Sequence, residues 1–348
     1  MENFERQPGI IYDQKLFNRD VRKDIRNCVL FILLFYVVNM ISTSIVMVIA
    51  MLQNPNFISS IMGGAGIGIF ESGGQNNLDS AMGSVLDLAT DGSMIGLMSI
   101  VGIICGGCVF LILRKKRFFT DVALPAAEKL TLKKFLILVV ITQGIQGAYS
   151  LIVTFIDFIL PSGVSLAENY GDTMGSLFTP VGLLYVVLIG PIFEELIFRG
   201  AIMGTLRRFG NNFAILFSSI LFGFYHMLIM QIPFAFVMGL LFGYVATRWS
   251  LRIAIVLHII VNGLSCLFSM QESLTIAGIA GLAMICCAIM TVIFAIVWRD
   301  SLKSRIGAGA AYYANTYAHG FSSIAFWIYI VITSLIGIAM LNGVYLPF

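Results

Sequence analysis

The sequence predicts an all-α fold, a polytopic membrane helix bundle of about nine transmembrane helices. Hydrophobic residues make up 59% of the 348 residues and charged residues only 11%, and the mean hydropathy is +0.94. Soluble domains carry about 25% charged residues, so this chain has too few polar groups to cover a surface in water. The composition therefore excludes the two soluble domains that the length alone would allow.

Nine apolar runs are candidates to cross a hydrocarbon core of about 30 Å, which takes about 20 helical residues. In chain order they cover residues 28–52, 94–113, 135–157, 177–199, 213–230, 233–248, 253–270, 275–298 and 322–345. The first run is too long for the apolar core of a signal peptide, so we expect it to remain as a span. The sixth and seventh runs are short and meet at a tight turn between Arg248 and Arg252.

The positions of Lys and Arg predict how the spans are oriented. Cytoplasmic loops of membrane proteins carry an excess of these residues. The segment 1–27 has six of them, whereas residues 53–93 and 161–175 have none. With nine spans, every basic loop falls on the same side of the membrane. This arrangement predicts a cytoplasmic N-terminus and an extracytoplasmic C-terminus, in an integral membrane protein for which we favour a bacterial plasma membrane.

The sequence divides into N-terminal spans, central spans and C-terminal spans. The predicted organisation is a cytoplasmic segment 1–27, an N-terminal pair of spans over 28–113, and C-terminal helices over 275–348. Residues 53–93 join the first pair and are rich in Gly, so we predict a flexible extracytoplasmic loop there. This loop is also a candidate surface for a cell-envelope protein partner.

Three of the spans carry polar or ionisable side chains, which are costly in hydrocarbon and by default mark function. These side chains and the aromatic neighbour that accompanies them are Glu194, Glu195 and Arg199 in the fourth span, Phe222 and His226 in the fifth, and His258 and Asn262 in the seventh. At about 1.5 Å per helical residue, the three sets all lie towards the middle of the bilayer. We therefore expect the three helices to surround one polar site.

Helical spacing separates the two carboxylates. Glu195 and Arg199 are four residues apart with the acid first, the favourable order for an ion pair within a helix. Glu194 points about 100° away and is left without that arginine, so it is the better candidate for a reactive carboxylate. His258 and Asn262 share one helix face and can address one point.

Pro191 precedes these carboxylates in the same span. It disturbs the helix just before Glu194 and frees backbone carbonyls. Free carbonyls are tolerated at membrane depth where a polar cavity supplies partners. Each polar group also has a purely structural interpretation: an inert ion pair, a packing histidine at position 226, or hydrogen bonds from His258 and Asn262 that bridge helices.

Taken in order, these residues resemble the membrane-embedded CAAX protease and bacteriocin-processing family, also called the Abi or CPBP family, which includes type II CAAX prenyl endopeptidases. The pattern Glu-Glu-x-x-x-Arg, Phe-x-x-x-His and His-x-x-x-Asn is complete here, beginning at Glu194, Phe222 and His258. The resemblance covers residues 130–270, which we therefore predict to be the catalytic core. It implies a water-filled cavity open to the cytoplasm.

The resemblance also implies a role for each residue in peptide-bond hydrolysis. Glu194 is expected to be the general base that activates water, assisted by His226. His258 and Asn262 are expected to stabilise the oxyanion. Glu195, Arg199 and Phe222 are expected to give structural support.

A metal-free mechanism is favoured, and no cofactor is expected. The alternative is a zinc site formed by Glu194, His226 and His258, since two histidines and a carboxylate suit zinc. Against zinc, the chain has no His-Glu-x-x-His motif, and Arg199 would repel a cation.

The predicted substrate is a membrane-associated peptide or protein within the lipid bilayer, as in peptide or bacteriocin maturation or immunity. No nucleic-acid partner is expected. The main alternative is a non-catalytic scaffold or immunity factor that partners a cell-envelope enzyme. A transporter or proton relay is disfavoured because the chain shows no convincing inverted repeat.

Overall fold

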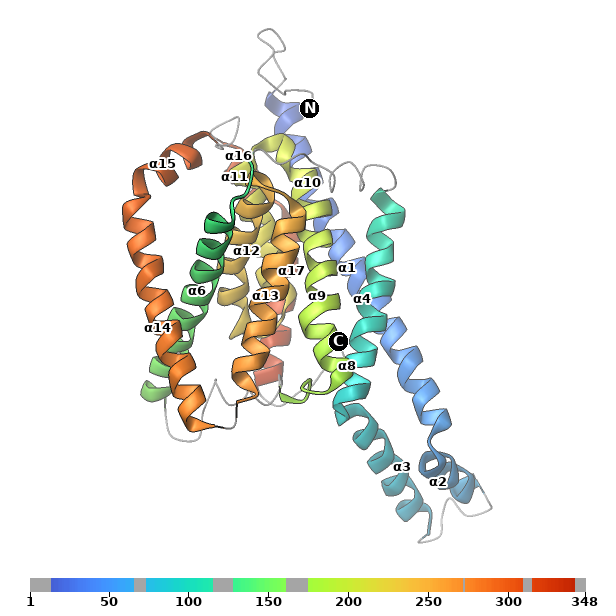
Figure 1. Ribbon diagram of the computed structural model, residues 1–348. Coiled ribbons are helices and arrows are strands. Elements are labelled where there is room, and N and C mark those ends of the chain that lie inside the picture. Colours follow the sequence, from blue (N-terminus) through green and yellow to red (C-terminus); the bar gives the residue numbers. More distant parts are fainter. Residues whose placement is uncertain are drawn as a thin grey trace.

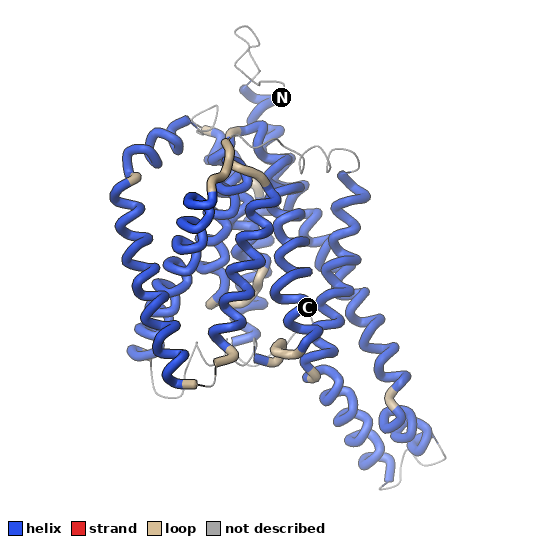
Figure 2. The backbone as a smooth tube through the Cα atoms, in the orientation of Figure 1, coloured by secondary structure: helices blue, strands red, loops and turns tan. Residues whose placement is uncertain are grey.

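The computed structural model describes residues 14–65, 73–114, 128–160, 175–271, 273–308 and 315–341. Within these ranges every regular element is a helix, and the helices form one bundle (Figures 1 and 2). The predicted all-α class is confirmed. Seven of the described helical segments are long and apolar enough to cross a membrane, so the chain is an integral, multi-pass membrane protein.

Most predicted spans correspond to single helices. These are α1 (Gln14–Gln53), α4 (Gly92–Arg114), α6 (Leu132–Ile159), α11 (Asn211–Tyr225), α12 (Gln231–Arg248), α13 (Leu251–Ser269), α14 (Leu274–Val297) and α17 (Ile324–Leu341). α11 and α17 are apolar but shorter than the other spans. Two short helices, α15 (Arg299–Ala308) and α16 (Thr316–Phe321), lie between α14 and α17.

The fourth predicted span is a composite helix with changes of register. Its parts are α8 (Pro180–Leu183), the π-helix η1 (Leu184–Ile189), α9 (Gly190–Glu195), the π-helix η2 (Leu196–Ile202), α10 (Met203–Leu206) and the 3₁₀-helix η3 (Arg207–Phe209). The span begins at a cap where the Thr179 side chain accepts from the Gly182 N–H at 3.1 Å and Pro180 follows, a favourable helix start. π-Helical turns are rare and gather at functional sites.

The predicted flexible loop at residues 53–93 is wrong for most of its length. The structure places helix α2 (Pro55–Ala65) and helix α3 (Gly73–Thr90) there, and residues 66–72 lie outside the described part. α2 and α3 project beyond the ends of the other helices as continuations of α1 and α4 (Figure 1). The prediction relied on the glycine content and overlooked a helix start at Asn54. The Asn54 side chain accepts from the Asn56 N–H at 3.0 Å, and Pro55 follows at the first helical position, which favours a helix.

Helix α14 lies at the edge of the bundle and packs closely on α6. A Cβ atom at Gly144 would overlap with Thr291 Oγ1 and come within 2.5 Å of the Cys287 carbonyl. A Cβ atom at Gly147 would come within 2.8 Å of the Met284 carbonyl. Small residues are what allow helices to approach this closely in lipid, so these two glycines hold α14 against the bundle.

Helix α11 ends earlier than the predicted span 213–230. The chain turns after Tyr225, and Met227 adopts a φ of 56°, which stops the helix. The hydroxyl of Tyr36 donates to the Tyr225 carbonyl at 2.6 Å, and that of Tyr149 donates to the Met230 carbonyl. Non-helical backbone at membrane depth is tolerated when buried partners satisfy it in this way, and the turn leaves His226 at the end of α11.

Replacing Tyr36 with Phe is expected to loosen this turn. The substitution leaves the Tyr225 carbonyl without its donor, which costs about 1–3 kcal/mol for a buried group. We expect a lower melting temperature of the purified protein in detergent. Ser42→Ala on the same helix is the control, because the Ser42 hydroxyl bonds only within α1, to the Val38 carbonyl at 2.7 Å. Equal melting temperatures for the two variants would contradict this account of the turn.

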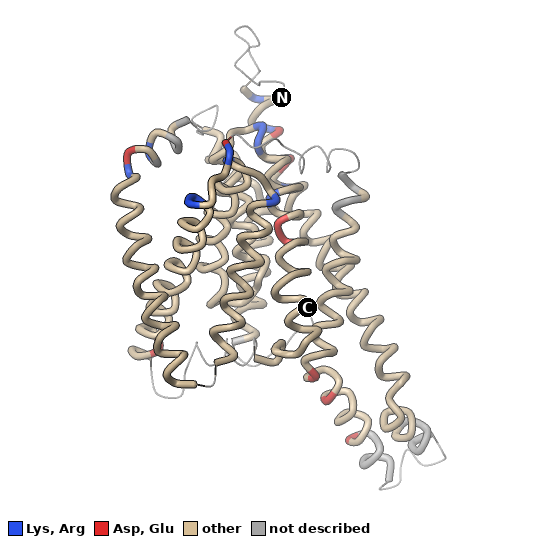
Figure 3. Tube along the Cα trace, in the orientation of Figure 1, with Lys and Arg blue, Asp and Glu red and all other residues tan. Residues whose placement is uncertain are grey.

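Basic side chains gather at the end of the bundle where the described chain begins (Figure 3). At this end Arg208 pairs with Asp24 at 2.6 Å, and Glu128 pairs with Arg248 and, at 3.7 Å, with Lys134. Acidic residues, in contrast, are found at both ends, on α3 at the opposite one, and also inside the bundle on α9 (Figure 3). The one-sided distribution of Lys and Arg read from the sequence is therefore also present in three dimensions.

Candidate active site

The polar residues of the fourth, fifth and seventh predicted spans come together in the structure. η2 lies against both α11 and α13, and α9 lies against α13. The positions concerned are buried or half-buried: Glu194, Glu195, Arg199, Phe222, His226, His258 and Asn262. The prediction that three helices surround one polar site is consistent with this arrangement.

A line of close contacts joins Arg199 to Glu194 through the site. Arg199 Nη1 lies 3.0 Å from Glu195 Oε1, and the same oxygen lies 3.0 Å from His258 Nδ1. His258 Nε2 lies 3.8 Å from Glu194 Oε2. Because a carboxylate can only accept, His258 donates from Nδ1 to Glu195, and this bond turns Nε2 towards Glu194.

The two carboxylates differ in access as well as in partners. The Glu195 side chain is 0% exposed and the Arg199 side chain 1%, whereas the Glu194 side chain is 11% exposed and that of His258 is 7%. The Glu194 side chain is therefore slightly accessible, whereas that of Glu195 is fully enclosed. The ion pair predicted from the four-residue spacing is present, and Glu194 is the carboxylate outside it.

Arg199 is held by groups from two further helices. Its Nη2 donates to the Gly239 carbonyl of α12 at 3.2 Å. Its guanidinium carbon lies 4.2 Å from the centre of the Phe222 ring and 5.6 Å from that of Phe242. Cation–π contacts of this kind are stronger when desolvated. Arg199 therefore links η2, α11 and α12 at the base of the site.

His226 is oriented by the last turn of α11. Its Nδ1 lies 2.9 Å from the Phe222 carbonyl, and since a carbonyl can only accept, Nδ1 carries the proton of the neutral ring. Nε2 is then an acceptor. The Phe222 ring stands edge-on to His226 with the ring centres 4.8 Å apart, which fits its expected supporting role.

Asn262 reaches the backbone of the fourth span. Its Nδ2 donates to the Val186 carbonyl at 2.9 Å. In η1 each amide bonds the carbonyl five residues earlier, as Gly190 does to Tyr185. The next amide would be that of residue 191, which is proline and has no N–H. The carbonyl that Pro191 was predicted to free is therefore that of Val186, and its partner is Asn262.

Several residues of the site carry no signal in the sequence. Phe242 stacks on His258 with ring centres 4.8 Å apart, yet it lies in an unbroken apolar run. Tyr36 of α1 and Tyr225 of α11 are close enough to Glu194 to interact with it electrostatically, as is Tyr185 of η1. Only the packing of the bundle shows that Tyr36 and Tyr225 lie near this carboxyl group.

The three residues of the alternative zinc site do not form a ligand set. Within the described ranges, no group of three or more His, Cys, Asp or Glu side chains is arranged to hold a metal ion. His258 Nδ1 is engaged by Glu195 and His226 Nδ1 by the Phe222 carbonyl. A zinc-bound histidine commonly bonds a carboxylate or a backbone carbonyl through its other ring nitrogen, so these bonds do not decide between zinc and a metal-free site, and the metal-free mechanism remains a prediction.

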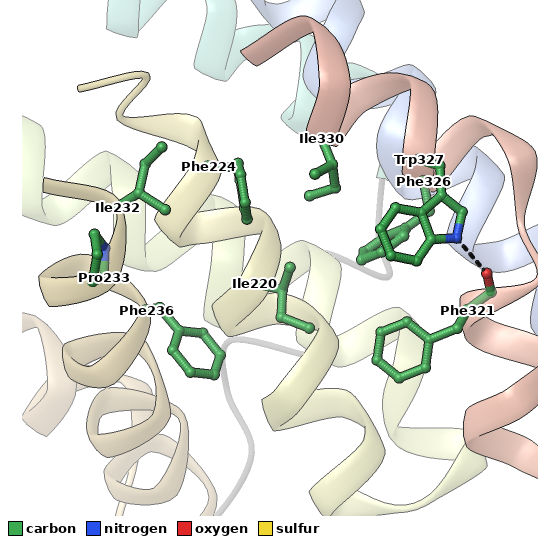
Figure 4. A pocket seen from close by; sticks show the side chains of 9 residues that line it. All are labelled: Ile220, Phe224, Ile232, Pro233, Phe236, Phe321, Phe326, Trp327 and Ile330. Carbon is green, nitrogen blue, oxygen red and sulfur yellow. Dashed lines mark hydrogen bonds between the residues drawn. The ribbon is translucent and has the colours of Figure 1, made fainter. Parts of the chain in front are cut away.

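An apolar cavity of about 340 Å³ lies between α11, α12 and the α16–α17 segment (Figure 4). Only apolar side chains line it, including Ile220 and Phe224 of α11, Phe236 of α12, and Trp327 and Ile330 of α17. It contains none of the predicted polar residues. The water-filled cavity open to the cytoplasm therefore remains a prediction.

The part of the chain that carries these residues is similar in sequence to known proteins. Residues 175–264 match the family model described as type II CAAX prenyl endopeptidase Rce1-like. The family resemblance is confirmed over these residues. All seven site residues lie within the matched residues, which are fewer than the predicted core of residues 130–270.

A relative among characterised proteins agrees with this family. The membrane-embedded CAAX protease MroQ of Staphylococcus aureus (strain USA300) is 34% identical over 100 residues, which is 26% of this chain. The match spans 40% of the length of that relative. No solved structure matches the chain.

Proposed function

We propose that this protein is an intramembrane endopeptidase that hydrolyses a peptide bond of a membrane-associated peptide or protein. The observation that carries the proposal is the environment of the Glu194 side chain. It is a nearly buried carboxylate at membrane depth, it lies outside the Glu195–Arg199 pair, and its nearest ionisable partner is His258, with Nε2 at 3.8 Å. Buried carboxylates of this kind serve as general bases when water reaches them.

In the proposed reaction Glu194 takes a proton from a water molecule as the water oxygen attacks the scissile carbonyl carbon. The carbon–oxygen π electrons move to the carbonyl oxygen, giving a tetrahedral oxyanion. When the oxyanion collapses, the carbon–nitrogen bond breaks and the amine leaves with the proton held by Glu194. One water is consumed, and a new carboxylate and a new amine are produced.

The histidines contribute hydrogen bonds at two points of this reaction. His226 has its Nε2 available as an acceptor, so it helps Glu194 to orient the water. His258 is fixed through Nδ1 by Glu195, so its Nε2 can stabilise the oxyanion when the ring is protonated. Hydrogen-bond donors held in place before the reaction stabilise such charge most effectively.

The proposed mechanism uses no metal ion, so a zinc chelator is expected to leave the cleavage rate unchanged. The expectation rests on the lack of a ligand cluster among the described residues and on the cationic Arg199 within the site. The measurement is the initial rate of peptide cleavage by the reconstituted protein before and after incubation with chelator. Activity that vanishes with chelator and returns on adding zinc would overturn the metal-free mechanism.

The proposal also includes topology and partners. The N-terminus and the basic end of the bundle face the cytoplasm, and the C-terminus lies outside, in a bacterial plasma membrane. The α2–α3 hairpin then projects from the outer face. It carries Asp79 and Asp87 on α3 but no Lys or Arg, and Met82 and Leu86 are exposed. We assign to this hairpin the docking of an envelope partner, and to the enzyme a role in peptide or bacteriocin maturation or immunity.

The proposed function is tested by comparing membrane-associated peptides from cells that carry the wild-type protein or Glu194→Gln. We expect at least one peptide pair, a longer form and its fragment, whose fragment disappears with Glu194→Gln. Asp300→Asn is the control, since Asp300 is an exposed carboxylate on α15. A phenotype of the wild-type protein that Glu194→Gln preserves in full would favour the non-catalytic scaffold instead.

A further inference from the structure

The helix that carries Glu194 departs from regular α-helical geometry immediately before this residue. η1 has the wider π-helical register, and α9 returns to the α-helical register at Gly190. Pro191 lies at the junction, one turn before Glu194. The direction in which α9 presents Glu194 therefore depends on how this junction is held.

The junction leaves one backbone acceptor without a backbone donor. The Gly190 N–H bonds the Tyr185 carbonyl, and an N–H at position 191 would bond the Val186 carbonyl in the same register. Pro191 cannot supply it. A buried carbonyl without a donor is costly, and at membrane depth bulk water does not replace the donor.

Asn262 supplies the missing donor from helix α13. Its Nδ2 lies 2.9 Å from the Val186 carbonyl oxygen, and the backbone of α13 is close at this point, since a Cβ atom at Gly263 would lie 3.5 Å from Val187 Cγ1. One turn earlier on α13, His258 bonds Glu195. α13 thus holds the fourth span at two points, one on each side of Glu194.

We propose that Asn262 is a positioning residue, whose amide replaces the N–H that Pro191 lacks and so fixes the direction of Glu194. The resemblance to the protease family implied instead that Asn262 stabilises the oxyanion. Its bond to the Val186 carbonyl supports the positioning role. The consequence for cleavage rests on the proposed function, but the coupling between Asn262 and Pro191 does not.

The coupling is tested by thermal unfolding in detergent of four proteins: wild type, Asn262→Leu, Pro191→Ala and the double variant, all in a Glu194→Gln background. Asn262→Leu is expected to lower the melting temperature. The double variant is expected to recover most of the loss, because an alanine at position 191 has an N–H that can bond the Val186 carbonyl. Additive effects of the two substitutions would overturn the inference.

A matched control lies one turn further along α13. The Ser265 hydroxyl lies 3.0 Å from Gln146 Oε1 of α6, so Ser265→Ala also removes a bond between helices, but not one near Pro191. Pro191→Ala is expected not to rescue Ser265→Ala, and an equal rescue there would contradict a specific link to Asn262. If Asn262→Leu does not fold, the double variant decides: folding supports the proposal and failure to fold overturns it.

Cleavage kinetics with Glu194 intact separate positioning from oxyanion stabilisation. A misplaced base predicts that Asn262→Leu lowers kcat by roughly 10- to 100-fold with little change in KM, and that Pro191→Ala restores kcat. An oxyanion donor predicts a loss that Pro191→Ala does not restore, and that result would overturn the positioning role. Pro191→Ala could rescue the melting temperature of Asn262→Leu while the wild type shows no cleavage. That combination would uphold the coupling and reject the proposed function.

Discussion

Glu194→Gln is expected to lower kcat for peptide cleavage by roughly 100- to 10,000-fold, the usual contribution of a general base. Glutamine keeps the size of the side chain but cannot take a proton from water. Glu194 is not part of the buried ion pair, so the melting temperature of the variant is expected to stay close to that of the wild type. The measurement is single-turnover cleavage by purified, reconstituted protein.

The neighbouring carboxylate provides the comparison for this prediction. Glu195→Gln weakens the contacts to both Arg199 and His258, so it is expected to lower the melting temperature as well as kcat. A Glu194→Gln variant that loses stability, or a Glu195→Gln variant that loses activity alone, would reverse the assigned roles of the two residues.

Arg199→Met is expected to cause the largest loss of stability, about 3–5 kcal/mol, as is typical when one partner of a buried ion pair is removed. The substitution leaves Glu195 charged in a fully buried position. It also removes the bond to the Gly239 carbonyl and the contact with the Phe222 ring. The measurement is the melting temperature in detergent, together with the fraction of the protein that remains monodisperse.

Arg208→Met is the matched control for Arg199→Met. Arg208 also pairs with a carboxylate, that of Asp24, but its side chain is 46% exposed. Exposure of this guanidinium weakens the pair relative to the fully buried one, so the melting temperature is expected to fall less than with Arg199→Met, even though Asp24 itself is only 13% exposed. Equal losses for the two variants would contradict the structural role given to the buried pair.

Local spacing predicts much of the site. The ion pair of Glu195 and Arg199 follows from four residues on one helix, and the separate direction of Glu194 follows from the 100° step between neighbours. The orientation of His226 by Phe222 depends on a four-residue spacing as well. These features need only a regular helix, which an apolar run predicts well.

Other features depend on contacts between distant parts of the chain. Pro191 predicts a freed carbonyl, but the π-helical register that selects Val186, and the packing that brings Asn262 to it, are tertiary properties. The ring of Phe242 on His258 likewise requires α12 and α13 to be adjacent. The helices α2 and α3 were missed because glycines at the centre of residues 53–93 outweighed the helix start at Asn54.

Hydrolysis by water at Glu194 is tested most directly by following the oxygen of the water. The measurement is mass spectrometry of the substrate peptide after incubation with reconstituted protein in oxygen-18-labelled water. We predict that wild type produces a fragment whose new carboxylate contains one solvent oxygen, together with a fragment that has a new amine, and that Glu194→Gln produces neither above background. Absence of cleavage by the wild type, or equal labelled product from Glu194→Gln, would contradict this mechanism.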